Sequence, residues 1–183
     1  MQKMLSAPLK LGEVDATHLF DFLYNFFHRD FVAGKTYLNG SIWINPRSHR
    51  LDDGKELDFW HLTTREQTKQ IKQGNQYVLK KERLLDYRRS ERIEWVKKII
   101  TQHTNSVVRC FYHKETNAKR DIRLYLWAYQ HDFVVILQRM GKSNAFLVTS
   151  FYIDHADKRR DFQLRYQRYH EGKVAELQGC EWF

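Results

Sequence analysis

The spacing of hydrophobic residues predicts a helix and a strand near the beginning of the chain. Residues 16–30 carry apolar side chains three or four positions apart, which is typical of an amphipathic helix, and Asp15 can serve as its N-cap. The apolar stripe consists of Leu19, Phe20, Leu23, Phe26 and Phe27. Residues 36–45 then alternate between apolar and polar side chains, which predicts a strand that ends at Asn45-Pro46.

The middle of the chain predicts mostly helix. Residues 57–63 predict a short strand or a buried turn, and residues 65–73 predict a short polar helix that Gly74 stops. We expect the longest helix of the chain at residues 81–103. Its apolar stripe consists of Leu85, Ile93, Val96, Ile99 and Ile100.

Four strand-like runs follow, and short polar turns separate them. They cover residues 106–112, 122–129, 133–138 and 145–153. Such short connections favour antiparallel hairpins. A basic, aromatic helix is expected at residues 156–170. The predicted fold is therefore α+β, with an N-terminal helix and strand, a long central helix, a four-stranded antiparallel sheet and a C-terminal basic helix.

Length and charge narrow the class of protein. The chain has 183 residues and contains no Gly/Ser-rich linker, which predicts a single domain over residues 1–183. Its 31 Lys and Arg residues exceed its 22 Asp and Glu residues, for a net charge of +9. This surplus favours a polyanionic partner, most commonly nucleic-acid phosphates, although a basic domain without a nucleic-acid role is the alternative.

The sequence also indicates a compartment. No apolar run is long enough for a membrane-spanning helix, and the first residues lack the pattern of a signal peptide. Cys110 and Cys180 are the only cysteines, and they form neither a disulfide framework nor a zinc pattern. We therefore expect a cytoplasmic protein without a membrane partner.

The first candidate for chemistry is the segment FWHLTTR at residues 59–65. The imidazole of His61 could take a proton from a ribose 2′-OH, because its ordinary pKa lies near neutral pH. Arg65, close behind it, could bind RNA. The alternative is a core histidine that is hydrogen-bonded to a backbone carbonyl.

The second candidate is a group of arginines in the expected central helix. Arg89 lies in line with the apolar stripe and Arg92 borders it, so each needs a partner or a ligand. A guanidinium suits phosphate, because it donates two parallel hydrogen bonds. The alternative is a pair of arginines that extend to nearby carboxylates. That is the simpler interpretation for Arg88, which we also assign to the RNA-binding surface.

Two further candidates lie near the C-terminus. In the last strand, Thr149 and Tyr152 could orient a scissile phosphate, although threonine and tyrosine are also ordinary strand residues. The following helix mixes cations with aromatic side chains, a combination that suits unpaired RNA. Its predicted RNA-binding residues are Lys158, Arg159, Arg165 and Tyr166. The alternative is a packed amphipathic helix with a solvated basic face.

The sequence lacks the common metal- and cofactor-binding motifs, and this limits the reactions that we expect. The sequence contains no HExxH, no CxxC pair, no P-loop and no Gly-rich dinucleotide turn, so we expect no metal site and no cofactor. An enzyme would then depend on His, Arg, Lys and hydroxyl groups. That set favours RNA over DNA as the substrate, because RNA supplies its own nucleophile.

In the order of these motifs, the chain resembles the barnase–EndoU–colicin–RelE-like nucleases, in particular their phage- or toxin-associated branch. The likeness covers residues 57–157, and residues 1–56 would be an N-terminal extension, with a basic helix and tail at 158–183. It rests on His61-Leu62-Thr63, on the R-x-x-R-I-x-W pattern from Arg89 to Trp95, and on the hydroxyl-rich strand at 148–152. The resemblance implies an α+β fold and metal-free cleavage of RNA.

The sequence therefore predicts a metal-independent endoribonuclease of the toxin type. His61 would act as general base or acid, Arg89 and Arg92 would stabilise the transition-state charge, and Thr149 and Tyr152 would orient the phosphate. An active cytoplasmic ribonuclease would need a cognate inhibitor or antitoxin protein as a second partner. The alternatives are a non-catalytic RNA-binding or regulatory module, and a structural phage or mobile-element protein that keeps the fold without activity.

Overall fold

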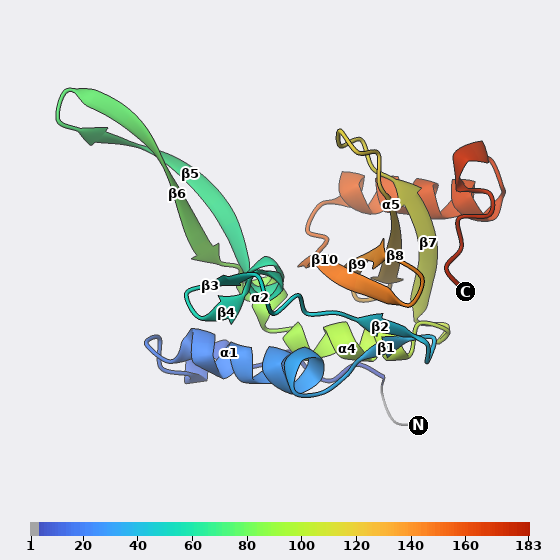
Figure 1. Ribbon diagram of the computed structural model, residues 1–183, viewed down its shortest axis with the longest axis horizontal. Coiled ribbons are helices and arrows are strands. Elements are labelled where there is room, and N and C mark those ends of the chain that lie inside the picture. The colour runs from blue at the N-terminus through green and yellow to red at the C-terminus, as the bar shows by residue number, and fades with distance from the viewer. Residues whose placement is uncertain (1–3) are drawn as a thin grey trace.

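The computed structural model describes residues 4–183, which form an α+β fold around a curled six-stranded sheet (Figure 1). In spatial order its strands are β1 (Tyr37–Leu38), β2 (Ile42–Ile44), β10 (Asn144–Tyr152), β9 (Phe133–Met140), β8 (Ile122–Ala128) and β7 (Val108–Lys114). Strands β2 and β10 are parallel and all other neighbours are antiparallel. The expected four-stranded sheet is wrong, because residues 36–45 form a hairpin of two strands that extends the sheet beyond β10.

The sheet is packed on both faces, as the side chains of β8 show. Leu124 and Leu126 point into the main core, whereas Tyr125 and Trp127 between them join a second cluster on the opposite face. Helix α5 (Ala156–His170) closes that second cluster with its buried Phe162. The position of α5 matches the helix expected at 156–170.

The main core extends from the sheet to two helices at the N-terminal side. Helix α1 (Leu19–Phe27) continues as a π-helical turn, η2 (His28–Val32), and α4 (Ile93–Thr101) packs beside it. The N-cap position of α1 is occupied by His18, so the expected N-cap at Asp15 is wrong. Instead the Asp15 carboxylate accepts a hydrogen bond from the backbone N–H of Thr17 at 2.8 Å.

The structure of residues 57–85 differs most from the elements that the sequence predicts. Residues 57–63 form a helix, α2 (Leu57–Thr63), and the expected polar helix is instead strand β5 (Thr64–Gln73). Strand β5 pairs along its whole length with β6 (Gln76–Leu85) and forms a long two-stranded ribbon. Gly74, with a φ of +64°, and Asn75 make the turn that joins them.

The expected long central helix is also wrong. Residues 81–85 belong to β6, and the remainder is divided into α3 (Tyr87–Ser90) and α4. Asp86 ends the strand and starts α3, because its carboxylate accepts a hydrogen bond from the backbone N–H of Arg89 at 3.1 Å. Three smaller features complete the fold. They are a hairpin of β3 (Leu51–Asp52) and β4 (Lys55–Glu56), and two short 3-10 turns, η1 (Leu11–Glu13) and η3 (Ala175–Leu177).

Hydrophobic contacts tie the ends of the chain to its centre. The main core draws on side chains from Leu5 to Trp182, and it includes Leu23 of α1 and Leu124 of β8. Cys110 and Cys180 are both free thiols. Within residues 4–183, no helix combines the length and the apolar character that a membrane crossing requires.

Candidate functional site

A cleft of about 420 Å³ lies where α2 ends, at the base of the β5–β6 ribbon and beside β10. It is lined by Trp60, His61, Thr64, Arg65, Glu66, Arg83, Arg89, Val148 and Thr149. Four residues singled out in the sequence therefore share one cleft: His61, Arg65, Arg89 and Thr149. They come from α2, β5, α3 and β10, which are brought together only by the tertiary fold.

An irregularity in β10 positions Thr149 in this cleft. The register of β10 against β9 shifts between Leu147 and Thr149, which leaves Val148 as the extra residue of a β-bulge. As a result Leu147 and Tyr152, five positions apart, both pack on the main core, whereas they would face opposite sides of a regular strand. At the bulge, the hydroxyl of Thr149 donates a hydrogen bond to the backbone carbonyl of His61 at 3.2 Å.

Arg89 joins three elements of the site. Its Nη1 donates to the backbone carbonyls of His61 at 2.7 Å and Thr64 at 2.9 Å, and it lies 3.4 Å from the hydroxyl of Thr149. The His61 carbonyl belongs to the last turn of α2, where a helix has acceptors without intrahelical partners, and the Thr64 carbonyl belongs to the first residue of β5. Burial lowers the pKa of Arg89, and Asp86 opposes that effect, with a carboxylate oxygen 3.8 Å from its Nε. Arg89 thus acts as a positioning residue that fixes the end of α2.

His61 is the exposed imidazole at the edge of the cleft. Within residues 4–183 its ring makes no hydrogen bond, so both nitrogens are available to a ligand. Desolvation lowers the pKa of His61, as do the positive charges of Arg47 and Arg50, whereas Asp58 raises it. Because the lowering effects dominate, the ring is neutral at neutral pH and can accept a proton.

A buried ion pair supports α2 beneath His61. Asp58, one helical turn before His61, accepts hydrogen bonds from Nε of Arg47 at 3.1 and 3.0 Å. The guanidinium carbon of Arg47 also lies over the ring of Phe146, 3.8 Å from the ring centre. Burial raises the pKa of the Asp58 carboxyl, and the charge of Arg47 counteracts that rise.

The polar rim of the cleft is predominantly cationic. Arg83 lies 4.8 Å from the ring of Trp60 and pairs with Asp52 at 2.6 Å. Glu66, the one carboxylate in the lining, pairs with Lys81 at 3.6 Å. Arg65 is exposed, and no residue from 4 to 183 forms an ion pair with its guanidinium. Arg65 is therefore the lining cation most available to an anionic ligand.

The structure places Arg88, Arg92 and Tyr152 outside the cleft. The two guanidinium carbons lie 4.8 and 5.0 Å from the centre of the Tyr152 ring, which they flank. Nη1 of Arg92 also donates to the backbone carbonyl of Arg88 at 2.8 Å. These contacts direct Arg92 to Tyr152 and to a neighbouring cavity, so the structure does not bring Arg92 into the cleft beside Arg89.

The candidate residues of α5 are engaged with the back of the sheet or with neighbouring residues of α5 itself. Arg159 pairs with Asp132, and Arg165 pairs with Asp161 at 2.7 Å. Nζ of Lys158 lies 4.0 Å from the ring of Phe151. Tyr166 packs against the second hydrophobic cluster. These contacts agree with the packed-helix alternative.

Three contributors to the site were missed in the sequence: Arg47, Asp58 and Arg83. A helical interpretation of residues 57–63 would have placed Asp58 and His61 on one face, since they are three positions apart. No local pattern could have brought Arg47 or Arg83 to the same place, because both depend on tertiary packing.

Neither a search of residues 4–183 for metal-binding side chains nor a comparison with known proteins adds a further candidate site. Over the described range 4–183, no group of three His, Cys, Asp or Glu side chains is arranged to hold a metal ion. Comparison of the chain with protein-family models, with curated proteins and with solved structures gave no match.

Proposed function

We propose that this protein is an endoribonuclease that cleaves RNA by attack of the ribose 2′-oxygen on the adjacent phosphate. The observation that carries the proposal is the position of His61, an exposed imidazole that forms no hydrogen bond with residues 4–183, in a cleft with Arg65, Arg89 and Thr149. A neutral imidazole beside fixed positive charge is what such a reaction needs. The resemblance to the barnase–EndoU–colicin–RelE-like nucleases, toxin-associated members included, supports the same proposal.

In this reaction the neutral imidazole of His61 takes the proton of the 2′-OH. The 2′-oxygen forms a bond to phosphorus, and the bond from phosphorus to the 5′-oxygen breaks with its electron pair. The departing 5′-oxygen takes a proton from water. The products are a 2′,3′-cyclic phosphate and a 5′-hydroxyl. The guanidinium of Arg65 stabilises the charge that develops on the phosphoryl oxygens, and Arg89 holds the end of α2 that carries His61.

Two further expectations belong to this proposal. The protein acts in the cytoplasm, where thiols such as Cys110 and Cys180 stay reduced. A cell that contains the active enzyme also needs an inhibitor or antitoxin protein that blocks it.

The proposal is tested by incubating the purified protein with single-stranded RNA in EDTA, beside a DNA strand of the same sequence. RNA should be cleaved and DNA should remain intact. The variant His61→Ala should lose about a hundredfold or more in rate while it keeps the circular dichroism spectrum of the wild type. The matched control His49→Ala changes an exposed histidine outside the cleft and should keep full activity. Salt-sensitive binding of RNA without cleavage would instead establish the non-catalytic RNA-binding module.

A further inference from the structure

The β5–β6 ribbon is the most exposed part of the fold. It extends away from the sheet and helices (Figure 1), and every residue from 65 to 81 is exposed to solvent. A two-stranded hairpin with both faces in water has no core of its own and is marginally stable at best. Ten-residue strands without packing are therefore better explained by a ligand that covers them.

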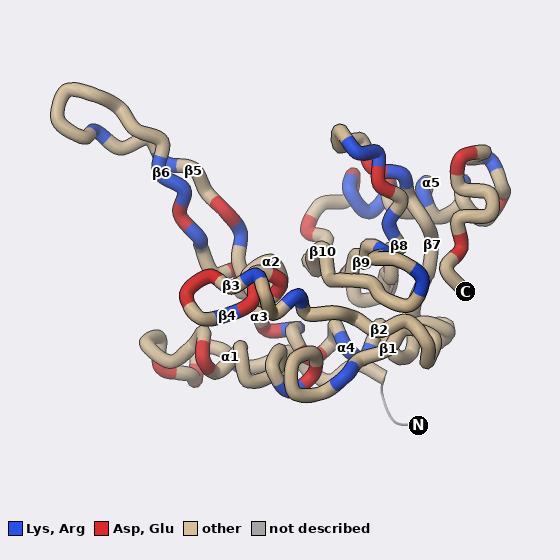
Figure 2. The backbone as a smooth tube through the Cα atoms, in the orientation of Figure 1, with Lys and Arg blue, Asp and Glu red and all other residues tan. Residues whose placement is uncertain are grey.

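The charge of the ribbon indicates what that ligand is. Lysine and arginine residues are distributed along both strands (Figure 2), and there are six of them against two glutamates. The six are Arg65, Lys69, Lys72, Lys80, Lys81 and Arg83. Both glutamates are already neutralised, Glu82 by Lys69 at 2.6 Å and Glu66 by Lys81 at 3.6 Å. The remaining positive charge is complementary to a polyanion.

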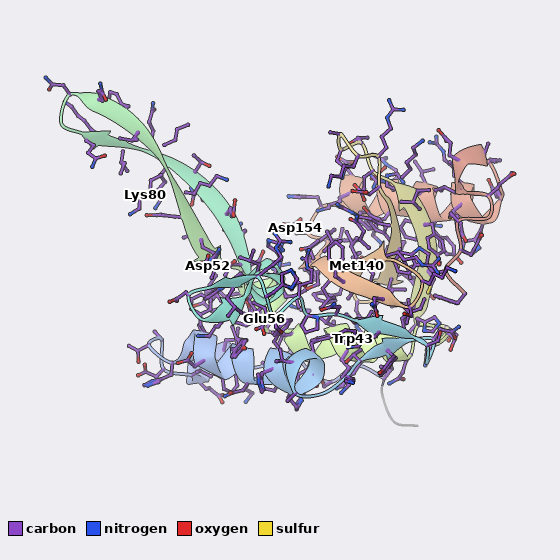
Figure 3. All side chains as sticks on the ribbon, viewed as in Figure 1. Trp43, Asp52, Glu56, Lys80, Met140 and Asp154 are labelled. Carbon is purple, nitrogen blue, oxygen red and sulfur yellow. The ribbon has the colours of Figure 1, made fainter. Side chains whose placement is uncertain are left out.

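Two lysines of the ribbon remain available to such a ligand. Lys72 and Lys80 form no ion pair with any residue in the described range 4–183, and Figure 3 shows Lys80 about midway along the ribbon. Lys72 lies directly opposite Tyr77 in the register of the two strands. Tyr77 is 68% exposed. A cation beside an exposed aromatic ring suits a phosphate and a stacked, unpaired base.

The ribbon is continuous with the cleft. Arg65 and Arg83 lie at its base and also line the cleft beside His61. An extended strand rises about 3.3 Å per residue, so Arg65 and Lys72 are roughly 23 Å apart along β5. A strand of RNA that lies in the cleft can thus continue along the ribbon for several nucleotides.

We propose that the β5–β6 ribbon is a binding arm for the single-stranded RNA that enters the cleft. On one face of the ribbon Lys72 binds a phosphate and Tyr77 stacks on a base, and Lys80 binds a further phosphate from the opposite face. This inference rests on the proposed ribonuclease function, because it assigns the arm to the same substrate. It adds that the enzyme takes long, unpaired RNA in preference to short fragments.

The arm is tested by steady-state kinetics of the full chain in EDTA on two substrates, a dinucleotide and a single-stranded RNA of about 16 nucleotides. In the variants Tyr77→Ala and Lys72→Ala/Lys80→Ala, KM for the long RNA should rise about tenfold. Cleavage of the dinucleotide, which cannot reach the arm, should not change. The control Lys119→Ala/Lys142→Ala removes the same charge from exposed turns elsewhere and should leave both substrates unaffected.

The two proposals fail in different ways. Unchanged KM for the long RNA in the arm variants, with the dinucleotide still cleaved, overturns the arm and leaves the ribonuclease intact. If the wild type cleaves neither substrate, the ribonuclease proposal fails. The arm is then judged by binding of the fluorescently labelled long RNA at low salt. Equal Kd values for the wild type and the arm variants would overturn it.

Discussion

The guanidinium of Arg89 donates a hydrogen bond to the backbone carbonyl of His61 at 2.7 Å. One cation of α3 thereby fixes the end of the helix that presents the imidazole. The same nitrogen donates to the carbonyl of Thr64 at 2.9 Å, so the start of β5 is fixed as well. The geometry around His61 therefore depends on Arg89 through the backbone carbonyl of His61.

Replacement of Arg89 should weaken both the fold and the activity. Arg89→Met leaves the His61 and Thr64 carbonyls without this donor, and the loss of hydrogen bonds in a partly buried site costs about 1–3 kcal/mol in the free energy of unfolding. Because the end of α2 is no longer held, kcat should also fall. Chemical denaturation and the cleavage assay measure the two effects. Arg88→Met, which alters an exposed neighbour, is the control, and equal loss in both variants would contradict the role of Arg89.

The pH dependence of cleavage should report a lowered pKa for His61. Desolvation and the charges of Arg47 and Arg50 lower this pKa from the ordinary value of 6.5. Because the base must be neutral, kcat/KM should rise with pH, reach its midpoint below 6.5 and be level at neutral pH. Arg50→Gln removes one of the charges and should move the midpoint upward. A midpoint above 6.5 in the wild type would contradict this environment for the ring.

The lowered pKa of His61 also makes the free energy of unfolding depend on pH. The folded protein binds a proton at His61 less readily than the unfolded chain, so the unfolded state takes up more protons as the pH falls below 6.5. The contribution of His61 to the free energy of unfolding is therefore fully present above pH 6.5 and decreases as the pH falls toward the folded-state pKa. The free energy of unfolding of the wild type, relative to that of His61→Ala, should be level above pH 6.5 and should fall as the pH is lowered, which thermal unfolding at several pH values measures. An opposite slope would show that the pKa is raised.

Replacement of Arg47 in the Arg47–Asp58 ion pair should strongly lower the free energy of unfolding. The Asp58 side chain is 1% exposed, so Arg47→Ala would leave a buried carboxylate without its partner. Removal of one member of a buried pair costs about 3–5 kcal/mol. Arg50→Ala, which changes a nearby exposed arginine, should alter stability by no more than about 0.5 kcal/mol. Urea denaturation distinguishes the two variants, and similar midpoints would show that the pair contributes little.

The regular parts of the fold could be predicted from the sequence, because their side-chain patterns are local. The strand-like apolar runs and the polar turns between them located β7 to β10, and α5 was found at residues 156–170. The segment from Leu57 to Leu85 could not be predicted in this way. Its strands are exposed on both faces, so they carry no apolar alternation, and α2 is buried on most sides and carries no amphipathic stripe.

The cleft was only partly predictable for a related reason. His61, Arg89 and Thr149 stood out because each departs from its local pattern. The bulge at Val148 and the pairing of Arg47 with Asp58 depend on contacts between distant segments. Arg92 was misplaced because the expected continuous helix put it beside Arg89, whereas the break between α3 and α4 turns it toward Tyr152.

The central claim is that the ribose 2′-oxygen is the nucleophile, and one substitution in the substrate tests it most directly. The protein is incubated in EDTA with an RNA that is cleaved at a mapped position, and with the same RNA carrying a single 2′-deoxynucleotide on the 5′ side of that position. Our account predicts a 2′,3′-cyclic phosphate from the first RNA and no cleavage at that position in the second. Cleavage of the deoxy-substituted position, or a linear phosphate as the first product, would contradict it.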